Sequence, residues 1–165
     1  MKPLPATHRL RSLLDYDPNS GVFRWRKNMS PNASAGSIAG SLKDDGHRWI
    51  VVDGQGYYAH RLAWKYHFGT DPVGRLDHRN NDHDNNAILN LRPATHSQNM
   101  CNRKVNARTR SGLKGAYKIN RGGWISIITF ENTRHYLGHF KTPEAAHAAY
   151  AAKSRQLHGD FSRLE

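Results

Sequence analysis

The residues of this chain best suited to chemistry are Asp77, His78, Asn90 and Asn99, spaced through its middle third. They supply a carboxylate, an imidazole, an amide that could orient the imidazole, and a second oxygen donor. Cleavage of a phosphodiester needs an activated water and positive charge near the leaving oxygen, and a divalent ion supplies that charge. The four residues therefore carry the functional groups of a phosphodiesterase that uses one metal ion.

Each of the four side chains suits one role. Asp77 is a hard oxygen ligand for Mg²⁺ or Mn²⁺, and Asn99 can add a neutral carbonyl oxygen. His78 suits a general base, and Asn90 could hold its imidazole either by hydrogen bonding or by fixing the loop backbone. In a regular strand His78 points away from Asp77, so we expect a local twist or a bulge to bring both to one site.

These side chains need a scaffold that positions them. The sequence predicts a short strand, a polar loop, a second short strand and a helix, at residues 75–78, 79–86, about 88–91 and about 95–104. On the helix, His96, Asn99 and Arg103 fall on one face. We expect this face to present Asn99 to the metal and Arg103 to a phosphate, with His96 as an alternative ligand.

The flanking segments predict two further small structures. Upstream, helical patterns near Leu10 and over 60–68 enclose short strand-like runs separated by Asp-Gly turns, which indicates a small antiparallel sheet. Downstream, three strand-like runs precede a helix that begins after the N-cap Thr142 and ends at Gly159. The predicted fold class is α+β, with one small sheet before the central motif and a three-stranded sheet packed on one helix after it.

Charge points to a polyanionic partner. The formal net charge is +12, and no Asp or Glu occurs from residue 85 through residue 130. Such a basic run can be a solvated face, but its position directly after the four residues favours nucleic acid. Glycines interrupt the run, which argues against a basic amphipathic helix on a membrane.

Other classes are disfavoured by what the sequence lacks. Its lone cysteine, Cys101, excludes an internal disulfide and a Cys-x-x-Cys zinc ribbon. No apolar run approaches the ~18 residues of a membrane span, and the first residues lack the apolar segment of a signal peptide. We therefore expect a cytoplasmic protein that is not secreted and has no membrane partner and no small-molecule substrate.

The segments around the four residues are Tyr58–Trp64, Leu76–His78, Asn85-Asn86, Leu89–Arg92 and Ala94–Asn99. In order and spacing they resemble the HNH endonucleases of bacteriophages and group I introns. The resemblance implies a ββα-metal fold at about 74–103, with His78 as general base and Asn90 positioning it. It also implies Asp77 and Asn99 as ligands of one Mg²⁺ or Mn²⁺. The third letter of the motif is Asn99 here, as in the single-metal homing type, so no structural zinc is expected.

Residues 113–161 resemble the DNA-binding domain of the ethylene-response-factor, or Apetala, type. The resemblance rests on Lys114–Tyr117, Gly123-Trp124, Tyr136–Phe140, Thr142–Ala146, Ala149-Tyr150 and His158-Gly159. It implies a three-stranded sheet that enters the major groove and a helix packed behind it. Together with the basic run, it gives these candidate DNA contacts: Arg92, Arg103, Lys104, Arg108, Arg110, Lys114, Tyr117, Arg121 and Arg134.

The resulting prediction is an HNH nuclease region at 1–103, a basic linker at 104–112 and a DNA-binding domain at 113–165. The predicted function is site-directed, homing cleavage that nicks double-stranded DNA, by a monomer or weak dimer near the nucleoid of an infected bacterium. One alternative is a non-catalytic, sequence-specific DNA-binding regulator with a structural HNH remnant. Another, supported by charge alone, is an RNA-binding or structural phage protein.

Overall fold

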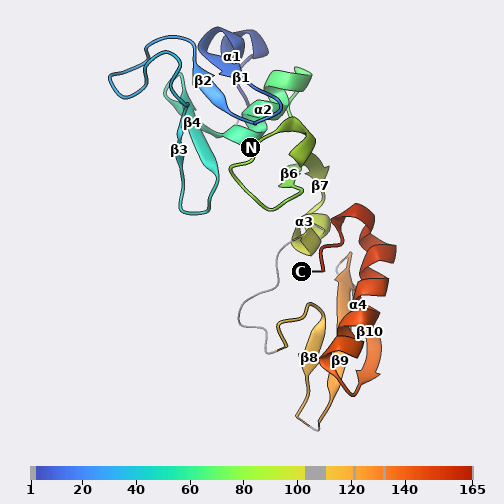
Figure 1. The fold of residues 1–165 in the computed structure, drawn as a ribbon. Coiled ribbons are helices and arrows are strands. Elements are labelled where there is room, and N and C mark those ends of the chain that lie inside the picture. The colour runs from blue at the N-terminus through green and yellow to red at the C-terminus, as the bar shows by residue number, and fades with distance from the viewer. Residues whose placement is uncertain (1–2, 103–110, 121, 132, 165) are drawn as a thin grey trace. The chain divides into compact units, whose positions relative to one another are not determined.

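The computed structural model describes residues 3–102, 111–120, 122–131 and 133–164. The chain divides into two compact units, Met1–Ala94 and Thr95–Glu165. Each unit combines helices with short antiparallel strands, as Figure 1 shows, which agrees with the predicted α+β class.

The first unit is built around a small core of aliphatic and aromatic side chains. Its elements up to the central motif are α1 (Thr7–Leu13), β1 (Leu14–Tyr16), β2 (Phe23–Trp25), β3 (Ser41–Leu42), β4 (Arg48–Val52), β5 (Gln55–Tyr58) and α2 (Ala59–Phe68). Strand β1 pairs with β2, and β4 lies between β3 and β5. Leu10, Phe23, Ile50 and Leu62 are fully buried between these elements. Helix α2 ends at Gly69 as predicted, because glycine adopts the left-handed conformation there.

The end of the first unit is a two-stranded antiparallel ladder. Strand β6 (Arg75–His78) pairs with β7 (Leu91–Ala94), from Arg75 opposite Ala94 to His78 opposite Leu91. The predicted second strand was placed too early, because residues Ile88–Asn90 form a single 3₁₀ turn, η1, before the ladder begins. Asn90 therefore precedes the paired strand instead of lying on it.

The second unit begins with α3 (His96–Asn102), followed by β8 (Ala116–Lys118), β9 (Trp124–Phe130), β10 (Thr133–Phe140), α4 (Pro143–His158) and the short turn η2 (Gly159–Phe161). Thr95 and Gln98 cap α3 reciprocally, each side chain accepting from the other's backbone amide. The strand order is β10-β9-β8. Helix α4 packs along this sheet (Figure 1), and Thr142 caps it as predicted.

Alternation along β9 divides the sheet of the second unit into two faces. Ser126 and Ile128 are buried beneath α4 with Ala146 and Ala151 of the helix. The strand register puts Tyr117, Arg134 and Tyr136 opposite Ile125, Thr129 and Ile127, on the face away from the helix. Tyr117 and Tyr136 are 50% and 61% exposed, so this face offers aromatic and basic side chains to solvent.

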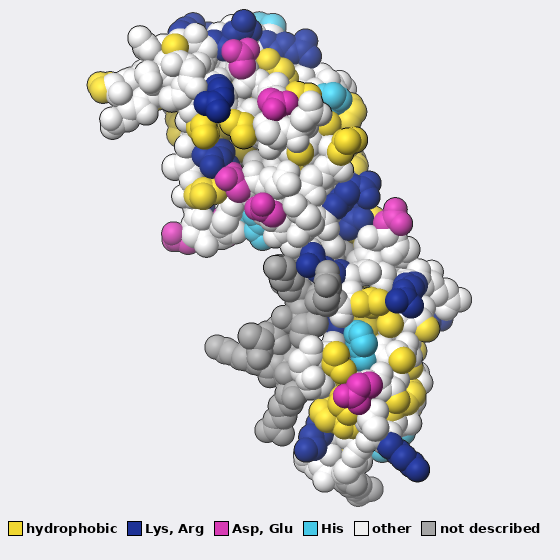
Figure 2. All heavy atoms as spheres, viewed as in Figure 1, with side chains coloured by type: hydrophobic (Ala, Val, Ile, Leu, Met, Phe, Trp, Pro, Cys, Tyr) yellow, Lys and Arg dark blue, Asp and Glu magenta, His cyan; other side chains and the backbone are white. Residues whose placement is uncertain are grey.

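The second unit is also the more basic one. Its Asp and Glu residues are Glu131, Glu144, Asp160 and Glu165, against Lys or Arg at 103, 104, 108, 110, 114, 118, 121, 134, 141, 153, 155 and 163. In Figure 2, Lys and Arg side chains appear on the visible face of both units. In the part of the chain that the structure describes, no helix combines the length and apolarity needed to span a membrane.

Candidate active site

Asp77 and His78 occupy the last two positions of β6, and each is only 4% exposed. The ladder over residues 75–78 is continuous, so the predicted bulge is absent from this strand and the two side chains leave opposite faces. Asp77 Oδ2 accepts a hydrogen bond from Arg92 Nε at 2.9 Å, directly across the ladder. The structure thus brings Asp77 together with Arg92, and His78 together with a different set of residues.

The imidazole of His78 is held by Asn86. His78 Nε2 lies 3.1 Å from Asn86 Oδ1, while Asn86 Nδ2 donates to the carbonyl of Asp84 at 3.0 Å. Because the amide nitrogen is engaged elsewhere, the amide oxygen faces the ring, and His78 donates through Nε2–H with its lone pair on Nδ1. Burial lowers the pKa of His78, and the hydrogen bond to Asn86 partly offsets this effect. A neutral imidazole of this kind can accept a proton.

Asn90 holds the loop instead of the ring. Its Oδ1 accepts from Asn80 N at 3.1 Å, and its Nδ2 donates to Asn80 Oδ1 and Asn85 O at 3.0 and 2.7 Å. Of the two ways in which Asn90 was expected to orient His78, these contacts match the second, fixation of the loop backbone. Asn86, which contacts the ring, was not singled out from the sequence, although it stands in the Asn85-Asn86 pair of the motif.

The backbone of Asn86 is in turn fixed by the first strands of the unit. Tyr16 Oη donates to Asn86 O at 2.7 Å. Gly21, at φ +77°, lies so close that a Cβ there would be 2.2 Å from the carbonyl carbon of Asn86 and the nitrogen of Ala87. Only glycine satisfies both the left-handed conformation and this contact. The β1–β2 hairpin therefore sets the position of the residue that holds His78.

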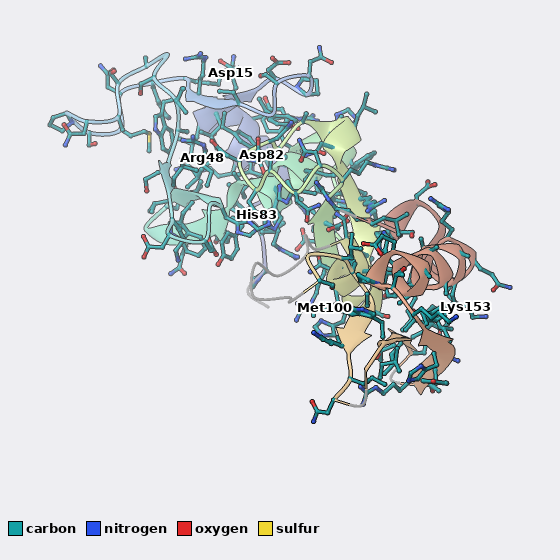
Figure 3. All side chains as sticks on the ribbon, turned by 60° about the horizontal axis from the view of Figure 1, so that its bottom comes forward. Asp15, Arg48, Asp82, His83, Met100 and Lys153 are labelled. Atoms are coloured by element: carbon teal, nitrogen blue, oxygen red, sulfur yellow. The ribbon has the colours of Figure 1, made fainter. Side chains whose placement is uncertain are left out.

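The other side of the loop is tied to β4. Arg48 donates from Nε and Nη2 to the two carboxylate oxygens of Asp84 at 2.8 and 2.7 Å. Such bidentate pairs fix both partners in orientation. In Figure 3, Arg48 lies near Asp82 and His83 of the loop. Residues 79–86 are thus anchored at both edges, which keeps Asn86 beside His78.

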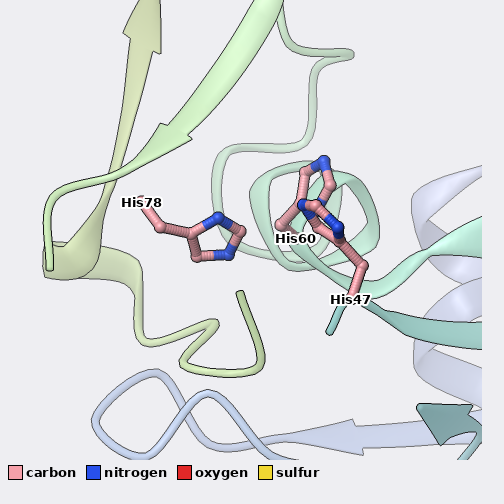
Figure 4. Close-up of side chains that lie close together, drawn as sticks. All are labelled: His47, His60 and His78. Carbon is pink, nitrogen blue, oxygen red and sulfur yellow. The ribbon is translucent and has the colours of Figure 1, made fainter. Parts of the chain in front are cut away.

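Three further histidines surround His78. The ring centroids of His47, His60 and His83 lie 5.7, 5.3 and 5.7 Å from that of His78. His47 precedes β4, His60 lies in the first turn of α2, and His83 stacks on His47 with centroids 4.2 Å apart. His83 is exposed, as expected from its polar loop. Figure 4 shows His47, His60 and His78 close together, an arrangement that the sequence did not predict.

The remaining predicted residues are distributed over the second unit. Asn99 and His96 lie on α3, Asn99 half-buried and His96 exposed. Because Asn99 and Asp77 belong to different units, their joint binding of a metal stays a prediction. Arg103, Lys104, Arg108, Arg110 and Arg121 lie outside the described residues.

Two of the predicted DNA-contacting residues, Arg92 and Lys114, make hydrogen bonds to other residues of their own unit. Arg92 is 6% exposed and paired with Asp77, so its burial argues against a surface role. Lys114 Nζ donates to the carbonyls of Cys101 and Arg163, and burial lowers its pKa. Both arrangements have one cause, since a partner distant in sequence can draw a long basic side chain inward.

Comparison with known proteins identifies a family domain in the middle of the chain. A family model described as HNH endonuclease matches residues 57–101, which include the β6–β7 ladder and the loop between its strands. The segment is thus an HNH endonuclease domain, and such a domain suggests DNA nuclease activity. Protein 3.8 of Escherichia phage T7 is 32% identical over 107 residues, which cover 64% of this chain and 88% of that protein. The chain therefore belongs to the same family as this phage protein. No solved structure matches the chain.

Proposed function

We propose that this chain is a DNA endonuclease of the homing type that hydrolyses one phosphodiester bond per active site, with His78 as the general base. The observation that carries the proposal is a buried imidazole, oriented by Asn86, inside an HNH domain. In this reaction His78 Nδ1 takes a proton from water, the water oxygen bonds to phosphorus, and the phosphorus–oxygen bond to the leaving sugar breaks.

We propose Asp77 and Asn99 as ligands of one divalent metal ion. Asp77 offers a carboxylate and Asn99 an amide carbonyl, hard oxygen donors that fit Mg²⁺ or Mn²⁺. When bound, such an ion polarises the phosphate and stabilises charge on the leaving oxygen. Arg92 keeps the Asp77 carboxylate in a defined orientation by donating from Nε. We assign Arg92 this positioning role.

The second unit is proposed to bind double-stranded DNA. Its exposed sheet face carries Tyr117, Arg134 and Tyr136, and its charge is strongly positive. This face corresponds to the one that the Apetala-type resemblance implies for DNA contact. The proposed setting is a bacterial cell infected by a phage, in which the protein acts on DNA as a monomer or weak dimer.

Replacement of His78 tests the mechanism. The His78→Ala variant should lose Mg²⁺-dependent nicking of phage and host DNA by at least about 10²-fold, the usual contribution of a general base. Mapping the DNA ends that the wild-type protein produces on genomic DNA would show whether it cleaves and at which DNA sequence. The exposed His67 provides a matched control, since His67→Ala should cleave normally. Undiminished cleavage by pure His78→Ala protein would remove the proposed base.

One observation favours a second candidate function. The Asp77 carboxylate is paired with Arg92, a cation where a catalytic site would need a metal ion. A regulator that retains the HNH fold without catalysis would tolerate this pair. Such a protein would bind its DNA tightly and leave it intact in both Mg²⁺ and Mn²⁺.

A further inference from the structure

The three histidines of the first unit, His47, His60 and His78, have the chemistry of a metal site different from the one discussed so far. One nitrogen of each lies within 4.8 Å of the others. They come from three separate elements, the end of the β3–β4 hairpin, the start of α2 and the end of β6. Imidazole nitrogens are softer donors than carboxylates and suit zinc and its neighbours in the transition series more than Mg²⁺.

The distances require only a modest closure around an ion. Zinc–nitrogen bonds of about 2.0–2.1 Å in a tetrahedral site imply nitrogens about 3.4 Å apart. The present separations reach 4.8 Å, so the rings must approach by rotation of their side chains. His47 is half-buried and directly precedes β4, at the loop of the β3–β4 hairpin. The close-up in Figure 4 shows its ring beside that of His60, with His78 facing them.

The hydrogen bonding of the rings also fits ligation. Metal-bound histidines usually place their second nitrogen against a carboxylate or a carbonyl, which fixes the ring. His47 Nδ1 lies 3.2 Å from Asp45 Oδ1, without the alignment of a full hydrogen bond, and His78 Nε2 faces Asn86 Oδ1. His47 would thus bind the ion through Nε2, and His78 would bind it through Nδ1.

His60 supplies an independent indication. Its Nδ1 is buried and has no hydrogen-bond partner within the described residues. A buried polar atom without a partner is unusual in a folded protein and calls for an explanation such as an ion. Burial and the neighbouring histidines also lower the pKa of His60 well below its usual value, which keeps its ring neutral. Neutral imidazole is the form that binds metals.

We propose that His47, His60 and His78 form a binding site for a transition-metal ion of the zinc class. His78 would be both the general base of the proposed nuclease and a ligand of this metal ion. Binding of the ion would therefore hold the imidazole of His78 and suppress cleavage, a consequence that rests on the proposed function. The sequence predicts no structural zinc, because it has a single cysteine and Asn99 at the third letter of the motif. His47, His60 and His78 lie far apart in the sequence, and the fold brings them together.

Zinc binding by the full-length protein in the absence of DNA tests the site directly. Titration with Zn²⁺, monitored by calorimetry, should show one ion per chain, and Co²⁺ should give the absorption of a tetrahedral nitrogen site. His47→Ala should weaken binding by more than roughly 100-fold, and Asp45→Asn, which removes an outer partner, by roughly 10–100-fold. The control His67→Ala should bind as the wild type does.

The buried His60 needs a check on folding, so His60→Gln is compared with wild type by circular dichroism before titration. Failure of the wild-type protein to bind Zn²⁺, or wild-type affinity in both His47→Ala and Asp45→Asn, would overturn the site.

A second measurement separates this inference from the proposed function. Nicking in Mg²⁺ is followed as Zn²⁺ is added, and each rate is expressed relative to the zinc-free rate of the same protein. Inhibition of the wild type should be relieved in His47→Ala. Zinc binding without any nicking would contradict the nuclease and leave the metal site standing, whereas nicking that is indifferent to bound zinc would contradict the inhibition.

Discussion

At the scale of single residues, two asparagines, Asn86 and Asn90, hold His78 in place, whereas the sequence predicts this role for Asn90 alone. Asn86 contacts the imidazole of His78 at 3.1 Å, while Asn90 makes three side-chain hydrogen bonds to the loop between β6 and η1. The base depends on Asn86 directly and on Asn90 only through the loop. The two residues should therefore respond differently to replacement.

Asn86→Ala should impair cleavage more than it impairs folding. Loss of the amide frees the His78 ring to rotate, and a misplacement of about 1 Å in a catalytic group can cost about 10²-fold in rate. The control Asn32→Ala, at an exposed position outside the site and its supporting hairpin, should retain its rate. The measurements are single-turnover nicking and thermal unfolding. If Asn86→Ala nicked at the wild-type rate, Asn86 would not position the base.

At the scale of elements, the loop that carries Asn86 is held by contacts from the first strands and from β4. Gly21 contacts the Asn86 backbone, Tyr16 donates to its carbonyl, and Arg48 binds Asp84 two residues earlier. Thus the hairpin β1–β2, far upstream in the sequence, belongs to the support of the site.

Gly21→Ala should destabilise the protein and slow cleavage together. The added Cβ would need space now occupied by the backbone at 2.2 Å, so the loop must shift. Gly54→Ala is the matched control, because Gly54 has a similar φ of +74° with nothing within 4 Å of a Cβ. The free energy of unfolding of Gly54→Ala should fall by only about 1–2 kcal/mol, the cost of the left-handed conformation, and its cleavage rate should stay unchanged. Equal losses of stability in both variants would contradict the packing argument.

Helix α2 is tied at its end by an ion pair that makes stability depend on pH. Lys65 Nζ lies 2.9 Å from Asp71 Oδ1, and its hydrogen bond lowers the pKa of Asp71 below the usual 3.8. A carboxyl whose pKa is lower in the folded state stabilises the fold above its unfolded pKa, and this contribution is lost as the pH falls through the folded pKa.

Lys65→Met should therefore lower the melting temperature near neutral pH, and the difference from wild type should narrow below pH 3.8. Thermal unfolding across the acid range measures this. Lys141→Met, at an exposed position of the second unit, is the control for removal of a charge. A gap between Lys65→Met and wild type that stayed constant with pH would show that Lys65 acts by packing alone.

At the scale of the whole molecule, charge is divided unevenly between the two units. The first unit holds most of the acidic residues, whereas the second carries an exposed sheet face with Tyr117, Arg134 and Tyr136. If about six basic groups met phosphates, the logarithm of affinity would fall with the logarithm of salt concentration with a slope of roughly −5.

Arg134→Ala should weaken DNA binding and reduce the magnitude of this slope by about 1, as expected for the loss of one phosphate contact. Lys153→Ala removes the same charge from α4, on the other side of the sheet, and should leave the slope unchanged. Binding to a short duplex at several salt concentrations provides both values. Equal effects of the two replacements would indicate attraction to net charge without a defined binding face.

The sequence by itself determined the elements whose signals lie within a few residues. Gly69 ends α2, Thr142 caps α4, and Gly159 follows the last residue of α4, as the sequence predicts. Such elements depend on backbone conformation and local hydrogen bonds, which neighbouring residues set. The motif residues Asp77 and His78 were likewise evident, because their spacing from the other motif residues is a property of the chain alone.

Only the tertiary structure decided which side chains meet. His78 contacts Asn86 across eight residues, Asp77 pairs with Arg92 across fifteen, and Arg48 reaches Asp84 across thirty-six. These pairings depend on the path of a loop and on the register of a ladder, neither of which leaves a periodic signal. The convergence of His47 and His60 on His78 has the same origin, since packing of three separate elements brings the rings together.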